Sequence, residues 1–297
     1  MTAHELHLAL ARHGKRRLEP ALPERPPPPF VPELDQLERE FVERERAAVS
    51  ERASEAPRDP DAFVRWFEDL RETGPGQGDP LFPWLAKSAS LAQMKWFLAQ
   101  EVAGEAGFDD LLALTQVKMP VQAKLELARN YWDEMGRGRR AGMHGPLLSA
   151  LARSLGVCSH PETTVWESLA LANLLVALAL DRRYAYHSVG ALGAIELTAP
   201  GRVAQVDAGL ARLGVPKAAR HYFTLHATLD VKHSEAWDRE VLRPLVSGEP
   251  RAARAIAEGA LMRLRAGARC FERYRAEFGL GRALHEAPAD ERLQWSP

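Results

Sequence analysis

The segment His226-Ala-Thr-Leu-Asp230-Val-Lys-His233 carries three side chains that can bind a metal ion. Successive residues of an α-helix are turned by about 100°, so Asp230 lies about 40° and His233 about −20° from His226 around the helix axis. Two imidazoles and a carboxylate therefore share one stripe of the expected helix. This spacing predicts part of a metal site, whose remaining ligands must come from other helices.

Two glutamates interrupt helix faces whose other residues are apolar. Glu101 lies on the face that carries Phe97 and Phe108, and Glu196 lies in a helix of small residues. A carboxylate buried without a partner costs several kcal/mol, so each glutamate needs a cation. A metal ion is one candidate for both, and Arg202 is an alternative partner for Glu196.

Three further residues enlarge the candidate site. Glu105 follows Glu101 by one helical turn and is an alternative ligand, an acid beside a ligand, or a rim residue. The position of Glu101 on the apolar stripe favours Glu101 as the ligand. Glu134 and His144 are separated by glycines that end a helix, so the chain can fold back and bring both to one site. Otherwise Glu134 is a solvated acid and His144 a helix-start residue.

The candidate ligands offer oxygen and imidazole nitrogen but no thiolate, a set that suits iron or manganese. Three histidines with several carboxylates suit two metal ions better than one, which favours a non-haem di-iron site. A ferritin-like site would show two Glu-x-x-His motifs, and the sequence has none. The expected metal and catalytic residues are Glu101, Glu134, His144, Glu196, His226, Asp230 and His233.

Helices must position these residues, because helical periodicity dominates from Ser90 onward and no alternating strand pattern competes with it. Glycines and Pro200 mark the expected breaks between helices. The apolar run Leu169 to Leu180 is too short to span a bilayer and predicts a buried core helix. The sequence therefore predicts an all-α bundle. The expected helices are 89–116, 120–135, 144–155, 161–180, 184–198, 200–213, 216–234, 235–246 and 250–279.

The N-terminal part differs in composition from the rest. Residues 20–32 hold seven prolines and predict an extended tether, which a highly charged helix follows from about Pro32 to Glu55. We expect an N-terminal arm over residues 1–58 and a helical domain over 59–297. The amphipathic pattern of helix 250–279 fits either a homodimer interface or packing on the body.

Composition narrows the class of protein. The 297 residues are 46% hydrophobic with a formal net charge of −1, so nothing indicates nucleic acid or a membrane surface as a partner. Two cysteines cannot build a disulfide framework, and the N-terminus lacks the pattern of a secretory signal. These features predict a cytoplasmic protein.

The candidate site resembles that of the haem-oxygenase-like di-iron oxidases and oxygenases, a family of iron-containing redox enzymes. His226, Asp230 and His233 match the motif of its last core helix, and Glu196 stands thirty residues upstream as the family pattern requires. In the family, a further Glu and His precede these two elements in the sequence. Glu101 and His144 would supply them, although they are farther apart here than in the family. Glu134 resembles an extra ligand of the N-oxygenating branch.

The resemblance implies a haem-oxygenase-like helical bundle with two Fe(II)/Fe(III) ions, O2 as co-substrate and a small amine or amino-acid-like substrate. N-oxygenation is the favoured reaction, and an external electron donor can take part. One iron would be bound by His144, Glu196 and His233 with Glu134, and the other by Glu101, His226 and Asp230. The alternatives are oxidative C–C cleavage or decarboxylation at the same site, a metal-free TenA-like enzyme, and a non-enzymatic iron-binding protein.

Overall fold

A computed structural model describes residues 1–24 and 31–281. Within these ranges the regular secondary structure is helical and contains no β-strand, which confirms the all-α prediction. The proline run at the centre of the predicted tether lies outside the described residues. The α-helices are α1 (Ala3–Leu18), α2 (Pro32–Ala47), α3 (Ser50–Ser54), α4 (Pro60–Thr73), α5 (Leu81–Lys87), α6 (Leu91–Gly104), α7 (Phe108–Thr115), α8 (Val121–Glu134), α9 (His144–Leu155), α10 (Trp166–Leu180), α11 (Ala185–Arg212), α12 (His221–Trp237), α13 (Arg243–Gly248) and α14 (Ala252–Glu277).

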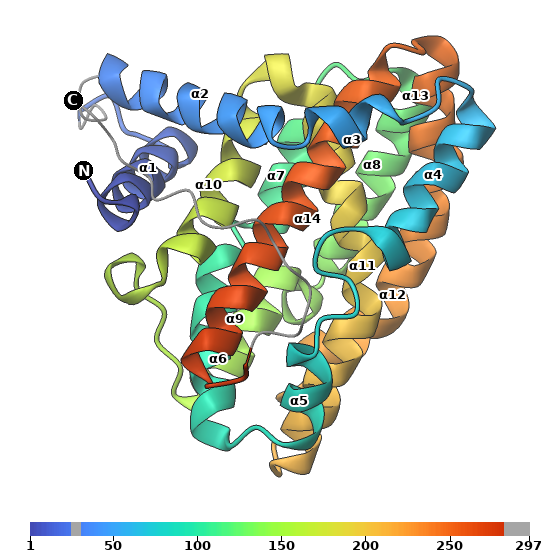
Figure 1. The fold of residues 1–297 in the computed structure, drawn as a ribbon. Helices are drawn as coiled ribbons and strands as arrows, with labels where there is room; N and C mark the ends of the chain where they lie inside the picture. The colour runs from blue at the N-terminus through green and yellow to red at the C-terminus, as the bar shows by residue number, and fades with distance from the viewer. Residues whose placement is uncertain (25–30, 282–297) are drawn as a thin grey trace.

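Helices α11 and α14 run side by side through the centre of the bundle, and α12 packs on the other side of α11 (Figure 1). Glycines set the close approach of the central pair. A Cβ atom added at Gly190 would lie 1.8 Å from the carbonyl oxygen of Ile256, and one at Gly259 would lie 1.9 Å from that of His187. Larger side chains at these two positions would force the helices apart.

The single helix predicted over residues 89–116 is wrong, because the chain divides it into α6 and α7. Ala106 and Gly107 adopt left-handed backbone angles, with φ of 63° and 75°, which no α-helix accommodates. The Glu105 carboxylate then accepts the backbone N–H groups of Gly107 and Phe108 at 3.0 and 2.8 Å. Glu105, the C-cap residue of α6, thereby satisfies the first backbone N–H groups at the start of α7.

The helix boundary predicted at Pro200 is also wrong, since α11 continues through this residue. Proline lacks an N–H group, so the carbonyl of Glu196, four residues earlier, loses its usual helical donor. Packing of α11 between α12 and α14 holds the helix together across this position. Tertiary contacts outweigh the local preference of proline here.

The N-terminal segment packs on the apolar helix α10. Leu6 and Leu10 are buried in the core, and the side-chain amide of Asn173 donates to the backbone oxygen of His7 at 2.8 Å. The apolar run of α10 is a buried core helix, as predicted. The boundary near residue 58 stays a prediction. None of the described helices is long and apolar enough to cross a membrane.

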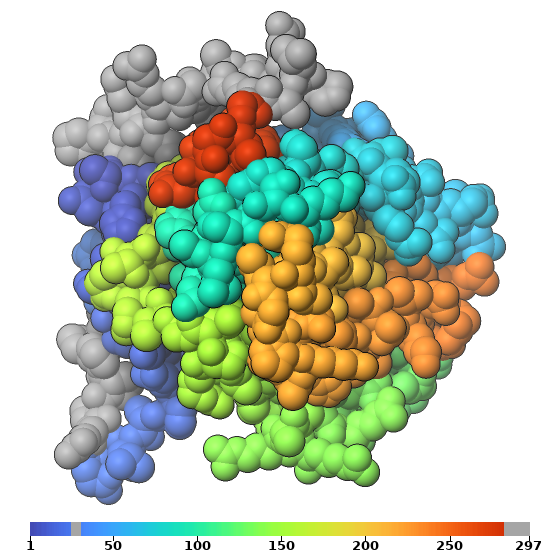
Figure 2. All heavy atoms as spheres, turned by 90° about the horizontal axis from the view of Figure 1, so that it is seen from below, coloured from blue at the N-terminus to red at the C-terminus, as the bar shows by residue number. Residues whose placement is uncertain are grey.

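One end of the bundle is formed by α5, α6 and the connection between α11 and α12, which lie side by side in the space-filling view (Figure 2). Phe82 of α5 and Phe97 of α6 line a cavity at this end, together with Phe223 near the start of α12. All three aromatic side chains are buried. The cavity extends from there to the residues of the candidate metal site.

Candidate metal centre

Two groups of potential metal ligands meet inside the bundle and share one residue, Glu134. One group consists of Glu134, His144 and His226, and the other of Glu134, Glu196 and His233. In each group the ligand atoms all lie within 4.8 Å of one another, and every member is buried. Helices α8, α9, α11 and α12 each contribute, so the site exists only in the folded bundle.

The two oxygens of Glu134 face different groups. Its Oε2 lies 2.8 Å from Nδ1 of His144 and 3.5 Å from Nε2 of His226. Its Oε1 lies 3.8 Å from Nδ1 of His233, which is also 3.4 Å from Oε1 of Glu196. A carboxylate in this position can bridge two cations.

The hydrogen bonds of the histidines determine which ring nitrogen faces the site. Nδ1 of His226 lies 2.7 Å from the backbone oxygen of Tyr222. A carbonyl oxygen only accepts hydrogen bonds, so Nδ1 carries the proton and donates. In the neutral ring, Nε2 then directs its lone pair toward Glu134 and His144.

The other two histidines are oriented in the same way. Nε2 of His144 lies 3.0 Å from Oε1 of Glu105, and Nε2 of His233 lies 3.3 Å from Oδ2 of Asp133. Each outer nitrogen thus faces a carboxylate acceptor, which leaves Nδ1 as the inward atom. An acceptor that holds the outer nitrogen of a ligating histidine is the usual support of metal sites in proteins.

Two buried atoms of the α12 stripe lack a hydrogen-bond partner among the described residues. Nδ1 of His233 and Oδ1 of Asp230 are buried without one. Asp230 belongs to neither group, but the charges of Glu196 and Glu134 act on its carboxyl group and raise its pKa. A cation between these atoms would satisfy them, so the donor set fits metal ions such as iron.

The electrostatics of the cluster also favour a bound cation. Burial, together with the charges of Glu196 and Glu134, raises the pKa of Asp230 well above its usual range. Burial by itself would lower the pKa of His233, but the carboxylates of Glu196, Glu134 and Asp133 outweigh it and raise the pKa to about 9. These shifts favour positive charge among the carboxylates, which a bound metal ion would supply.

Five of the seven residues expected from the sequence come together in the two groups. Asp230 belongs to neither group, and Glu101 lies apart from them. It accepts a hydrogen bond from the hydroxyl of Tyr274 at 2.9 Å and is in neither ligand group. Glu105, the alternative, instead contacts His144. The expected division between two irons also differs from the geometry, because His144 lies with His226 rather than with His233.

Sequence reasoning missed three residues that orient the expected ligands. Asn130 donates to Oε1 of Glu196 at 2.7 Å, Asp133 faces His233, and Tyr222 contacts both His144 and His226. Asn130 and Tyr222 each stand one turn before a candidate ligand on the same helix face, a signal that could have identified them. Asp133 gave no such signal, because it is next to Glu134 and points in a different direction around α8.

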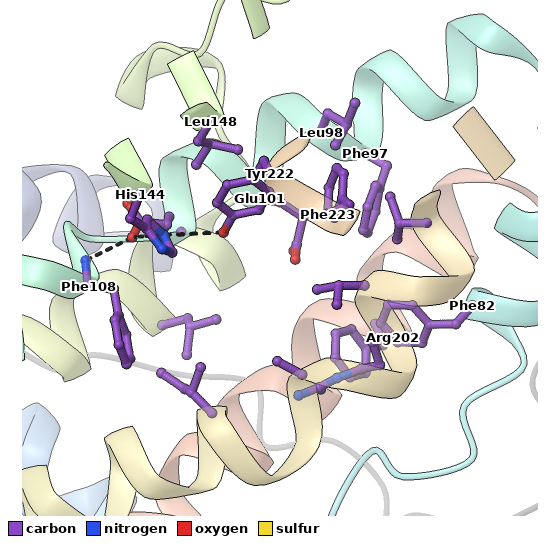
Figure 3. Close-up of a pocket in the computed structure, with 18 of the residues that line it drawn as sticks. Phe82, Phe97, Leu98, Glu101, Phe108, His144, Leu148, Arg202, Tyr222 and Phe223 are labelled. Carbon is purple, nitrogen blue, oxygen red and sulfur yellow. Dashed lines mark hydrogen bonds and ion pairs between the residues drawn. The ribbon is translucent and has the colours of Figure 1, made fainter. Parts of the chain in front are cut away.

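A cavity of about 160 Å³ borders the site, and its wall is mainly apolar. Figure 3 shows His144 at one end of this cavity, with the Tyr222 hydroxyl 3.2 Å from its Nε2. Arg202 and Phe82 lie at the other end, and Glu101 lies between the two ends. An apolar pocket with a few polar groups at its ends is typical of small-molecule sites.

Comparison with known proteins agrees with this geometry. A family model described as iron-containing redox enzyme matches residues 95–268, more than half of the chain. No curated protein matches. Among solved structures, a CADD-like protein of unknown function from Nostoc punctiforme PCC 73102 has a TM-score of 0.57 at 21% identity, over 73% of this chain and 97% of its own. The prediction of a haem-oxygenase-like bundle is confirmed, and the chain belongs to the family of iron-containing redox enzymes.

Proposed function

We propose that the protein is a non-haem di-iron oxygenase that uses O2 to oxidise a small amine or amino-acid-like substrate, by N-oxygenation. The position of Glu134 between two groups of inward-facing ligands carries this proposal. Glu134, His144 and His226 would hold one iron, and Glu134, Glu196 and His233 the other. The unpartnered Asp230 would complete the second set.

Two iron ions would supply the electrons and the binding site for O2. The protein's own residues orient the substrate and keep water out. The cavity wall places apolar groups, including Phe108 and Leu148, beside His144. Burial raises the pKa of Tyr222 well above its usual range, so its hydroxyl stays protonated and can donate a hydrogen bond to a bound substrate.

An amine substrate is supported by the carboxylates at this end of the cavity. Glu105 lines the cavity beside His144, and Glu134 lies behind the same imidazole. Negative charge there favours an approaching ammonium group. The spacing of Glu134 and His144, which resembles the N-oxygenating branch of the family, supports the same reaction.

The test is anaerobic titration of the metal-free protein with Fe(II), followed by exposure to O2 with a panel of amines and amino acids. We expect two irons per chain in the wild type, one in His226→Ala and none in Glu134→Ala. Glu235→Ala, an exposed position on α12, serves as the matched control and should bind two. The mass of the product should increase by that of the oxygen added to the amine nitrogen. A product that has lost carbon would identify C–C cleavage instead.

Two results of the iron titration would contradict a di-iron site bridged by Glu134. One is a folded protein that binds no iron, which favours the metal-free alternative. The other is a Glu134→Ala variant that still binds two irons, since no bridging position would then exist. Stable iron with no O2 consumption would identify a non-enzymatic iron-binding protein.

A further inference from the structure

The end of the cavity away from His144 contains two arginines that lack an acidic partner. Arg202 on α11 and Arg263 on α14 both line it. Neither guanidinium has a carboxylate oxygen within 4.0 Å in the part of the chain that the structure describes. Buried cations are normally paired, so this end of the cavity is unusual.

Arg263 has donors that no atom of the described residues satisfies. Its Nε and Nη1 atoms are buried and form no hydrogen bond with the described residues. Gly267, one turn later on α14, leaves room for the guanidinium, since a Cβ there would lie 2.7 Å from Nη1. Leaving buried donors unpaired is costly, and a bound acceptor would remove that cost.

Arg202 is held in place but only partly satisfied. It donates from Nε to the backbone oxygen of Thr198 at 3.0 Å and from Nη2 to the hydroxyl of the same residue. Its guanidinium carbon lies 5.8 and 5.3 Å from the ring centres of Phe82 and Phe271. Burial, followed by the charge of Arg263, lowers the pKa of Arg202 to about 9, so it remains charged at neutral pH.

One carboxylate, Glu101, lines the cavity near these arginines, and it is already bonded to Tyr274. Burial raises the pKa of Glu101, while the charges of Arg263 and Arg202 oppose this shift. Two guanidinium groups and one acid leave this end with positive charge even when Glu101 is ionised. One anionic group would bring it to neutrality.

We propose that Arg202 and Arg263 bind the carboxylate head of the substrate, and that the apolar body of the substrate extends along the cavity to His144. Arginine is suited to this role because its planar donors match the two oxygens of a carboxylate. Figure 3 shows Arg202 and His144 at opposite ends of the cavity. On α11, Glu196 and Arg202 point about 120° apart around the helix axis.

This arrangement has a consequence for the reaction, which rests on the proposed function. With its carboxylate on the arginines, the substrate presents a distant atom to the candidate metal site. Oxidation of an amine remote from the carboxylate is therefore favoured over loss of that carboxylate as CO2. Binding of the carboxylate itself does not depend on iron.

The test measures binding of hexanoate and hexanamide to the metal-free full-length protein by isothermal titration calorimetry. Metal-free protein is used because a carboxylate could otherwise bind the iron, and because the result then stands apart from the di-iron proposal. We expect hexanoate to bind at least roughly ten-fold more tightly than hexanamide, since hydrogen bonds to charged groups are the stronger ones.

Variants assign the effect to the two arginines. Arg202→Met and Arg263→Met should each weaken hexanoate binding roughly ten-fold while hexanamide affinity stays unchanged, which also shows that the cavity is intact. Arg273→Met on α14, whose ion pair is with Glu277, is the matched control. Equal binding of acid and amide, or wild-type hexanoate affinity in both arginine variants, would overturn the proposal.

A second ligand pair distinguishes simple carboxylic acids from amino acids. If the substrate carries an α-amino group, 2-aminohexanoate should bind more tightly than hexanoate, and Glu101→Gln should remove the difference. If it does not, hexanoate should bind at least as tightly. Either result supports a carboxylate site, provided that the arginine variants weaken the binding.

Discussion

Replacement of Glu105 by glutamine should weaken one of the two proposed iron sites. Glu105 does not face the ligand groups directly, but its Oε1 lies 3.0 Å from Nε2 of His144. The charge of this acceptor makes the imidazole a better ligand through its other nitrogen. Glu105→Gln retains the size of the side chain and removes the charge, so the change acts on His144 with little change in packing.

The expected size of the effect follows from this contact. The Glu105 side chain is only 19% exposed, so solvent screens the interaction weakly. Loss of an acceptor behind a ligating histidine typically costs about 10- to 100-fold in metal affinity, or about 1.4–2.7 kcal/mol. Glutamine also has a single acceptor oxygen for the N–H groups of Gly107 and Phe108, which should cost about 1 kcal/mol of stability.

Glu101→Gln is the matched comparison. Both glutamates were candidates from the sequence, but Glu101 bonds to Tyr274 and to no histidine among the described residues. We expect its iron affinity to stay within about two-fold of wild type, below the range for a residue that supports a ligand.

The assay is anaerobic competition for Fe(II) against a coloured chelator, which resolves the two affinities. Glu105→Gln should weaken one site and leave the other unchanged. The reasoning is refuted if Glu101→Gln loses iron while Glu105→Gln does not. In that case the side chain on the stripe of α6 would be the ligand, and the contact between Glu105 and His144 would be incidental.

Three further predictions concern the metal-free protein, the support of Glu196 and the central helix pair. The pKa of His233 rises from 6.5 to about 9 on folding, so protonated His233 adds roughly 3 kcal/mol to the free energy of unfolding. This contribution is complete below pH 6.5 and is lost as pH rises through 9. Urea unfolding of the metal-free wild type should show this decline, and His233→Gln should not. Asn130→Ala removes the donor to Glu196 and should lower iron affinity about ten-fold at one site in the same competition assay. Equal loss of affinity at both sites would contradict the assignment of Asn130 to the site that contains Glu196. Gly190→Ala should destabilise the fold by about 3 kcal/mol or more in thermal unfolding. Gly201→Ala on the same helix, whose added Cβ would meet no atom of the described residues within 4 Å, should be neutral or stabilising. Similar effects of the two variants would show that α11 and α14 are not held by close contact.

The all-α class was predictable because helical periodicity is local and strong. Each helix buries one apolar face, and that face is formed by residues three and four positions apart in the sequence. The errors occurred where the backbone departs from the local preference. Ala106 adopts a left-handed conformation without being glycine, and Pro200 sits inside a helix that its neighbours hold together.

The candidate site was predictable to the extent that it is local. His226, Asp230 and His233 share a face because they share a helix, and all three are buried on α12. The choice between Glu101 and Glu105 could not be made locally. It depends on a helix break at Ala106 and on the position of α9, which carries His144.

Local patterns in the chain were enough to identify the helical class, the stripe on α12 and the chemical type of the ligands, since helix geometry depends on neighbouring residues and ligand chemistry on residue type. The tertiary structure was needed to place Glu134 between two ligand groups and to bring Arg202 and Arg263 to the wall of one cavity. These residues belong to different helices, and their distances depend on how the helices pack. Helix packing depends on contacts between residues far apart in the chain, and a local sequence pattern does not predict these contacts.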